Sequence, residues 1–223
     1  GELGIDALIV ADPGILALAR EILTEVEMHL STQASMTNWR SARFWYEQGV
    51  KRIILARELS AEEIGEIKAQ VPEIDLEVFV HGAMCVSYSG RCLLSAYMAG
   101  RDANLGDCAQ PCRWKYHLME EKRPGEYFPI EESEEGTFIF NSRDLCLIGQ
   151  IPDLARLGVT SLKIEGRMKS VHYVATVVGA YRRAIDGYYS NPAEWQVDPD
   201  WLAELDKVSH RPYTTGFFTG RPG

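Results

Sequence analysis

Apolar runs of strand length alternate with amphipathic segments of helix length, and this alternation limits the fold more than any other feature of the chain. Strands are expected at residues 5–12, 29–36, 51–60, 76–84 and 161–167. Helices are expected at residues 14–26, 38–49, 61–71, 147–158 and 170–189. Such alternation predicts a parallel α/β sheet whose ligands collect at the carboxyl ends of the strands.

Five strand–helix units are too few for a closed eight-stranded barrel. Either the sheet is open, or the first three units of a TIM-type (β/α) barrel are missing. The start at Gly1 without Met favours truncation, so we expect the C-terminal part of such a barrel. The predicted regions are barrel units (1–81), a Cys-rich lid inserted between the last two strands (82–141), the last strand and helices (142–190) and a C-terminal appendage (191–223). Residues 120–145 predict a polar loop that carries a short β-hairpin.

Charge and cysteine content narrow the function. The net charge of −9 over 223 residues argues against a generally basic nucleic-acid coat, although a local basic patch is compatible with it. The sequence has no apolar run of membrane-spanning length and no export signal, so a cytoplasmic protein without a membrane span is expected. Five cysteines in such a chain favour metal or redox chemistry over a disulfide framework.

Four of the cysteines form two pairs, with the spacing C-x6-C-x15-C-x3-C. They are Cys85, Cys92, Cys108 and Cys112. Four thiolates suit a tetrahedral sulfur site, which selects zinc or an iron–sulfur cluster. The spacing does not choose between these metals, although zinc sites prefer closer pairs than the first one here. Cys146 is expected to be a small buried residue, and it is the reserve ligand if Cys112 is not used.

Two other interpretations compete with an iron–sulfur site. His81 and Cys85 lie four residues apart at a predicted strand end, where an imidazole could activate a thiolate for proteolysis. No third orienting residue is identifiable, and the hydrolase motifs H-E-x-x-H and G-x-S-x-G are absent from the sequence. The remaining alternative is a structural zinc lid on a binding domain.

Positively charged residues surround the cysteines and could bind a dicarboxylate or RNA phosphate. They are Arg91, Arg101, Arg113, Lys115, Lys163, Arg167 and Lys169. Trp114 and Tyr116 alternate with two of them, which suits base stacking as well as core packing. Because the chain is acidic overall, RNA recognition is expected to be local and aided by a partner subunit or a second copy.

The motifs "EVFVHGAMCVSYSGRCLLSAYMAGRDANLGDCAQPCRW", "RPGEYFPI", "NSRDL" and "SLKIEGRMKS" occur in this order. Together they resemble the collagenase-like U-32 peptidases, and the resemblance covers essentially the whole chain. Within that family the chain is most similar to the branch that makes 5-hydroxyuridine at the tRNA wobble position. The resemblance implies an RNA hydroxylation enzyme, with peptidase activity as the alternative that the family name suggests.

The resemblance also carries expectations about the site. It implies a 4Fe-4S cluster on Cys85, Cys92 and Cys108, and Cys112 fits the tRNA-modifying branch. Its most characteristic motifs contain His81, Glu165 and Arg167, which are therefore the candidate catalytic residues. It further implies tRNA as the substrate and a prephenate-type small molecule as the hydroxyl source. Ring hydroxylation needs a cofactor in any case, because protein side chains do not supply this redox chemistry.

Overall fold

The computed structural model describes residues 4–85, 87–89, 92–114, 117–119, 121–125, 128–129 and 143–220. Its main feature is a seven-stranded sheet in the order β1-β2-β3-β4-β7-β9, with β8 also paired to β4. The strands are β1 (Ala7–Val10), β2 (Glu27–Leu30), β3 (Val50–Ile54), β4 (Asp75–Ala83), β7 (Asp144–Cys146), β8 (Ser161–Ile164) and β9 (Tyr213–Thr214). Strands β1 to β4 and β8 run parallel, so their carboxyl ends share one edge of the sheet.

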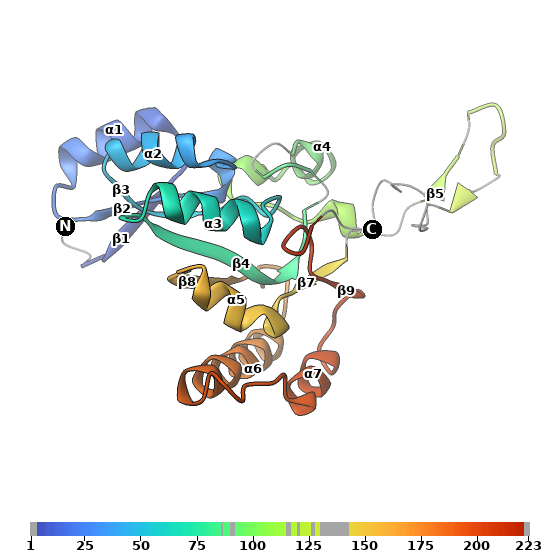
Figure 1. Cartoon of the computed structure of the whole chain (residues 1–223). Coiled ribbons are helices and arrows are strands. Elements are labelled where there is room, and N and C mark those ends of the chain that lie inside the picture. Colours follow the sequence, from blue (N-terminus) through green and yellow to red (C-terminus); the bar gives the residue numbers. More distant parts are fainter. Residues whose placement is uncertain are drawn as a thin grey trace.

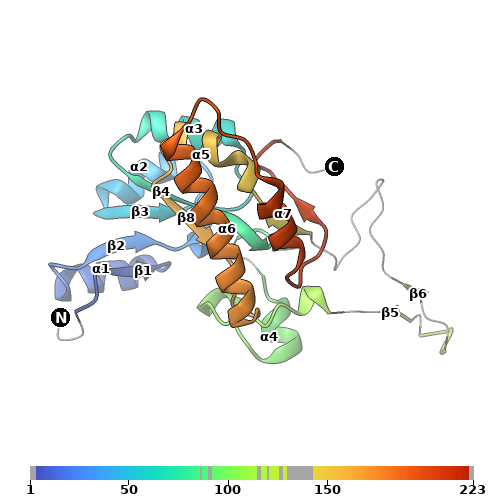
Figure 2. The ribbon, with the colours of Figure 1, turned by 90° about the horizontal axis from the view of Figure 1, so that it is seen from below.

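Helices lie on both sides of β4. Figure 1 shows α1, α2 and α3 on one side and α5, α6 and α7 on the other, and Figure 2 shows α7 beside the long α6. The helices are α1 (Pro13–Ile22), α2 (Trp39–Glu47), α3 (Ala61–Gln70), α4 (Leu94–Ala99), α5 (Ile151–Arg156), α6 (Val171–Ser190) and α7 (Pro199–Asp206). Short 3₁₀ helices occupy Thr32–Ala34, Ala103–Leu105, Pro111–Arg113 and Ile148–Gln150. None of the described helices is long and apolar enough to cross a membrane.

The core lies around β4, where every residue after Asp75 is buried. Burial on both faces is typical of a parallel strand that is covered by helices, and it explains the continuous apolar run. Local signals agree with the tertiary packing. Ser60 and Glu63 form a complete capping box at α3, and the Ser170 side chain caps α6. The predicted α/β fold is therefore confirmed, and the sheet is parallel through β1 to β4 and β8, whereas β7 pairs antiparallel with β4.

Two described strands of the main sheet, β7 and β9, were not predicted, and one predicted strand was partly wrong. The expected strand over 29–36 ends at Leu30, because the chain turns into a 3₁₀ helix that Ser35 closes with a φ of 53°. Strand β7 pairs antiparallel with the end of β4, and β9 pairs parallel with β7. The cysteine-rich stretch is thus followed by β7 before the chain reaches β8, which differs from an insertion between the last two strands.

The predicted boundaries between regions can be compared with the observed strands at two places. Strand β4 continues to Ala83, beyond the predicted boundary at 81. The predicted C-terminal appendage adds β9 to the main sheet and buries Trp201, Leu205 and Phe218 in the core. A two-stranded hairpin joins β5 (His117–Leu118) to β6 (Phe128–Pro129), and most of the rest of 120–145 lies outside the described residues.

Candidate functional site

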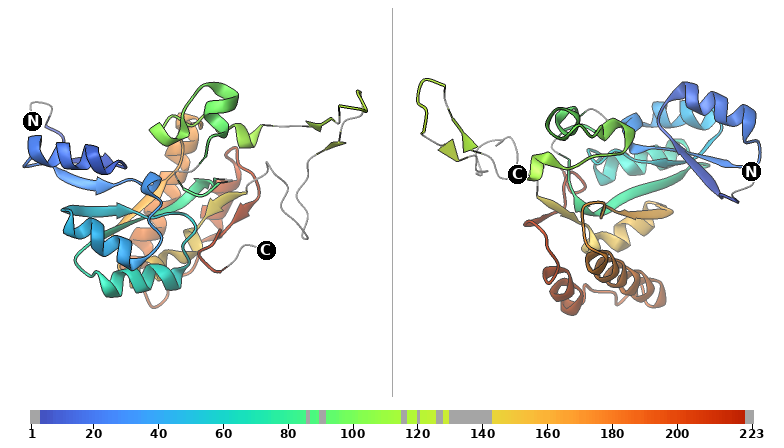
Figure 3. Two further views of the ribbon diagram at one scale, coloured as in Figure 1. Left: turned by 90° about the horizontal axis from the view of Figure 1, so that it is seen from above. Right: turned by 180° about the vertical axis from the view of Figure 1, so that it is seen from behind.

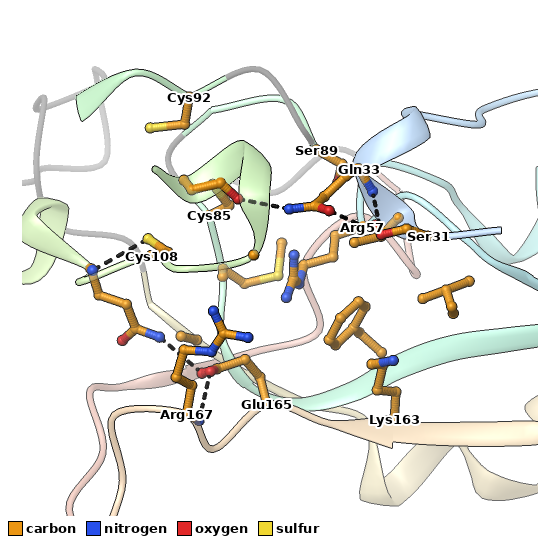
Figure 4. Close-up of a pocket in the computed structure, with 18 of the residues that line it drawn as sticks. Ser31, Gln33, Arg57, Cys85, Ser89, Cys92, Cys108, Lys163, Glu165 and Arg167 are labelled. Carbon is orange, nitrogen blue, oxygen red and sulfur yellow. Dashed lines mark hydrogen bonds between the residues drawn. The ribbon is translucent and has the colours of Figure 1, made fainter. Parts of the chain in front are cut away.

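A cavity of about 460 Å³ lies at the carboxyl ends of the parallel strands. The strand ends form one wall of the cavity, and the Cys segment forms the other. We define the Cys segment as residues 85–114 without residues 86, 90 and 91. Helix α4 of this segment lies near the end of β4 (Figure 3). Strand ends contribute Ser31, Thr32, Gln33, Arg57, Lys163, Glu165 and Arg167, and the Cys segment contributes Cys85, Ser89, Cys92, Cys108, Gln110, Cys112 and Arg113 (Figure 4). This edge is where parallel sheets bind ligands, so the cavity is the candidate site.

All four predicted cysteine ligands line this one cavity. Desolvation raises the pKa of Cys85 and of Cys112, and the neighbouring thiols raise both values further. Within the described ranges, however, no three His, Cys, Asp or Glu side chains are gathered at metal-binding positions. The donor chemistry therefore fits a sulfur-ligated metal or cluster, whose binding requires the four side chains to draw together.

The first cysteine pair is anchored to the end of β3. Glu58 accepts hydrogen bonds from the Ser89 backbone N–H (2.7 Å) and from the Ser89 hydroxyl (3.1 Å). Ser89 lies between Cys85 and Cys92 in the sequence and is only 2% exposed. A single carboxylate thus holds both polar groups of a buried residue in this stretch.

The second cysteine pair is anchored to the end of β8 through Gln110. The Gln110 backbone N–H donates to Cys108 Sγ (3.3 Å), while its side-chain Nε2 donates to Glu165 Oε2 (3.1 Å). Glu165 Oε1 accepts the backbone N–H of Arg167 (2.9 Å). Gln110 has a φ of 55°, an uncommon conformation for a residue other than glycine. Glu165, a predicted catalytic residue, therefore contacts the cysteine-bearing chain.

A third carboxylate holds the chain next to Cys112. Asp144 of β7 is fully buried and forms an ion pair with Arg113, whose Nη2 also donates to the Met84 carbonyl (3.2 Å). Lys169 Nζ lies 3.6 Å from the same carboxylate. Arg113 therefore connects the residues preceding Cys85 with those following Cys108. We call Glu58, Glu165 and Asp144 the three anchoring carboxylates.

Gly82 explains why the β4 strand can come so close to the end of β8. Its φ is +102°, and a Cβ atom at this position would lie 2.3 Å from the Glu165 carbonyl oxygen. The Glu165 N–H donates to the His81 carbonyl across the same contact (2.9 Å). Only glycine accepts both the backbone conformation and the close approach, so Gly82 sets the position of Glu165.

His81 does not face the cavity. It is 1% exposed and lies among the rings of Tyr173, Tyr181 and Tyr213, with centroid separations of 6.1, 5.5 and 5.3 Å. Burial lowers the pKa of His81 to about 4, so the imidazole is neutral at pH 7. The cavity lining includes Cys85 but not His81. The structure therefore does not bring these two residues together as the predicted nucleophile and base.

Cys146 also lies away from the cavity. It is the last residue of β7 and pairs with His81 in the strand register. Its Sγ lies 4.0 Å from the hydroxyl of Tyr181. Burial raises the pKa of this thiol. Cys146 was expected to be buried and is partly buried, and this reserve ligand is not placed with the other four thiols.

The predicted basic residues have different partners. Arg101 pairs with Asp107, Lys163 with Glu77, and Lys169 and Arg113 with Asp144. Arg167 lines the cavity, Trp114 is 45% exposed, and Arg91, Lys115 and Tyr116 lie outside the described residues.

Arg57 was not among the predicted site residues. It lies in the cavity with its guanidinium carbon 3.6 Å from the centroid of the Phe79 ring. Burial lowers the pKa of Arg57, although the charges of Cys85, Glu165 and Glu58 oppose this change. The signal was its position directly after an apolar strand. No sequence pattern marked three of the residues that anchor the Cys segment, Ser89, Gln110 and Asp144.

Comparison with known proteins places the chain in a family. It is 48% identical to tRNA hydroxylation protein P1 of Bacillus subtilis, covering 100% of this chain and 52% of that protein. It is 43% identical to tRNA hydroxylation protein P of Escherichia coli (97% and 56%) and 34% identical to the 23S rRNA 5-hydroxycytidine synthase of Escherichia coli (99% and 33%). The chain thus spans about half the length of the tRNA hydroxylation proteins named here.

One solved structure, of a U32 peptidase, matches with a TM-score of 0.37 and 19% identity, covering 62% of this chain and 54% of that one. A similarity this low establishes the position of no element. The family model for Peptidase family U32, by contrast, matches residues 1–223. The chain therefore belongs to peptidase family U32.

Proposed function

We propose that the protein is an RNA hydroxylation enzyme that modifies the wobble uridine of tRNA. The observation that carries this proposal is the convergence of four thiols on one cavity at the carboxyl edge of a parallel sheet. Relatives named as tRNA hydroxylation proteins and as an rRNA 5-hydroxycytidine synthase support hydroxylation of a pyrimidine ring in RNA. RNA modification also supports a cytoplasmic location.

Cys85, Cys92, Cys108 and Cys112 would hold a 4Fe-4S cluster in the proposed enzyme. Such a cluster supplies one-electron redox chemistry, which uracil hydroxylation needs and side chains lack. The chain's own residues prepare the site. The three anchoring carboxylates hold the cysteine-bearing chain against the strand ends, and the Gln110 N–H donates to Cys108 Sγ. Hydrogen bonds of this kind to ligand sulfurs tune a cluster's potential.

The two alternatives receive less support. Proteolysis by Cys85 relied on His81 as the base, and His81 lies in a buried aromatic cluster outside the cavity. A structural zinc site would use the same four thiols, but it leaves unexplained why they face an open cavity with polar strand ends. We retain zinc as an outcome of metal analysis and proteolysis as an outcome of activity assays.

The proposal extends to the fold and to the other reactants. The sheet would be the C-terminal part of a TIM-type barrel with the Cys segment as its lid. Within the described residues β1 is an edge strand, and α1 beside it exposes Ile15, Leu18 and Ile22, so further barrel units could pack here. A prephenate-type acid would supply the hydroxyl group, and a second copy or partner subunit would help to bind tRNA.

The test is wobble-uridine hydroxylation in cells that lack the full-length gene. Re-expression of the wild-type protein should restore 5-hydroxyuridine, measured by mass spectrometry of tRNA nucleosides. Cys108→Ser should restore none, because it removes a proposed ligand. Cys146→Ser is the matched control and should restore the modification, because Cys146 lies outside the cavity. Unchanged 5-hydroxyuridine in the deletion strain would refute the proposed function.

A further inference from the structure

Two guanidinium groups face the cavity without a paired carboxylate. Arg57 follows β3 and lies over the Phe79 ring, whereas Arg167 follows β8 and its Nη2 lies 4.0 Å from where a Cβ of Gly106 would be. Figure 4 shows both side chains reaching into the same space. In the part of the chain that the structure describes, neither side chain has a hydrogen bond or an ion pair.

The other described cations that line the cavity have ion-pair partners within the protein. Lys163 Nζ lies 2.9 Å from Glu77, and Arg113 pairs with the buried Asp144. The two carboxylates whose charges act on Arg57 already accept hydrogen bonds from other groups. Glu58 accepts two hydrogen bonds from Ser89, and Glu165 accepts from Gln110 and from the Arg167 backbone. Among the described cations of the cavity lining, Arg57 and Arg167 are the two without an ion pair.

The geometry points to a binding subsite for a small organic carboxylate, formed by Arg57 and Arg167. A guanidinium that stacks on an aromatic ring keeps its N–H groups free at the edge, where they match the two oxygens of a carboxylate. Apolar side chains of the same cavity, Ile54, Phe79 and Met84, would cover the body of the ligand. A volume of about 460 Å³ is typical of a small-molecule site.

This subsite deepens the proposed function and rests on it for its role beside the four thiols. It would place an acid between the strand ends and Cys85, which lines the same cavity as Arg57 and Arg167. A competing role for Arg57 is compensation of thiolate charge alone. A competing ligand is a phosphate group of RNA. Both alternatives give results that differ from those of a carboxylate subsite.

The experiment measures binding to the full-length protein by isothermal titration calorimetry. The probes are 3-phenylpropionate, its uncharged amide and inorganic phosphate. The acid should bind at least about tenfold more tightly than the amide, since charge-assisted hydrogen bonds contribute about that much. Arg57→Gln should weaken binding of the acid by about tenfold or more. Arg57→Lys should weaken it less, and Arg167→Gln should also weaken it.

Arg182→Gln is the matched control, because Arg182 is an exposed residue of α6 that pairs with Asp186. It should leave binding unchanged, and circular dichroism should show every variant folded. Equal binding of acid and amide would overturn the inference, as would unchanged acid binding in Arg57→Gln or phosphate binding more tightly than the acid. A protein that binds the acid through Arg57 but leaves uridine unmodified in cells would refute the proposed function and retain the subsite.

Discussion

The parallel sheet and the Cys segment are stabilised in different ways. The sheet buries long apolar side chains on both faces of β4, and helices cover it on both sides. The Cys segment contains one six-residue α-helix and two 3₁₀ helices, and three anchoring carboxylates attach it to the strand ends. We infer that the sheet folds through its own apolar burial, whereas the geometry of the thiols depends on a few polar contacts and on what the thiols bind.

The largest effect is expected from the contact that joins the two regions at Asp144. Asp144→Asn should lower the free energy of unfolding by about 3–5 kcal/mol, because the buried guanidinium of Arg113 loses its counter-charge. Urea denaturation measures this change. Asp107→Asn removes the exposed partner of Arg101 and should leave stability close to wild type. Equal effects of the two substitutions would contradict a special role for the buried pair.

Substitution of Gly82 tests the close contact between β4 and Glu165, the residue that follows β8. Gly82→Ala should destabilise the protein by about 2–4 kcal/mol, because a Cβ would combine backbone strain with a 2.3 Å contact to the Glu165 carbonyl. Gly100→Ala is the matched control, since Gly100 also has a positive φ but a Cβ added there would meet no atom within 4 Å. Its expected cost is about 1 kcal/mol. Thermal and urea unfolding should show Gly82→Ala as the more destabilising change.

The stability of the sheet should also depend on pH, through the titration of His81. Burial lowers the pKa of His81 to about 4 in the folded protein, despite the opposing charge of Asp144 and in addition to the charges of His210 and Lys169. The unfolded imidazole binds a proton below about pH 6.5, so its contribution to stability is complete above that pH and is lost as the pH falls toward 4.

Between pH 7.5 and pH 5 this one group should remove about 2 kcal/mol of stability. His81→Phe keeps an aromatic ring in the cluster and should abolish this part of the pH dependence. The measurement is urea unfolding of both proteins at the two pH values. Parallel losses of stability in wild type and His81→Phe would show that His81 is not the titrating group.

The smallest effect is expected within the Cys segment itself. Ser89→Ala removes one of the two hydrogen bonds to Glu58 and should cost about 1 kcal/mol. Hydrogen–deuterium exchange should become faster around residues 87–89 while amides in β4 keep their protection. Faster exchange throughout the sheet would contradict the independence of the two regions.

The sequence predicted the elements whose periodicity is strong, and it missed those that depend on distant partners. Strands β1, β3, β4 and β8 and helix α3 followed from apolar runs and capping signals. Strand β7 has only three residues and its partner β4 lies far away in the chain, so no local pattern marked it. All four thiols line one cavity, and their assignment as ligands of a metal or cluster stays a prediction.

The role of His81 was harder to predict for a specific structural reason. Simple alternation places it on the same face as Phe79, which lines the cavity. The pairing of β4 with β8 shifts register between Phe79 and His81, and such an irregularity changes the direction of the side chains that follow. His81 therefore packs among tyrosines while Cys85 reaches the cavity. Asp144 and Gln110 were likewise missed because their partners become neighbours only after folding.

We propose that the four thiols of the Cys segment hold an iron–sulfur cluster. The most direct test is iron, acid-labile sulfide and zinc analysis of the anaerobically purified full-length protein, beside its Cys108→Ser and Cys146→Ser variants. We expect a brown wild-type protein with near-equal iron and sulfide, loss of both in Cys108→Ser, and their retention in Cys146→Ser. A colourless wild-type protein with stoichiometric zinc would contradict it.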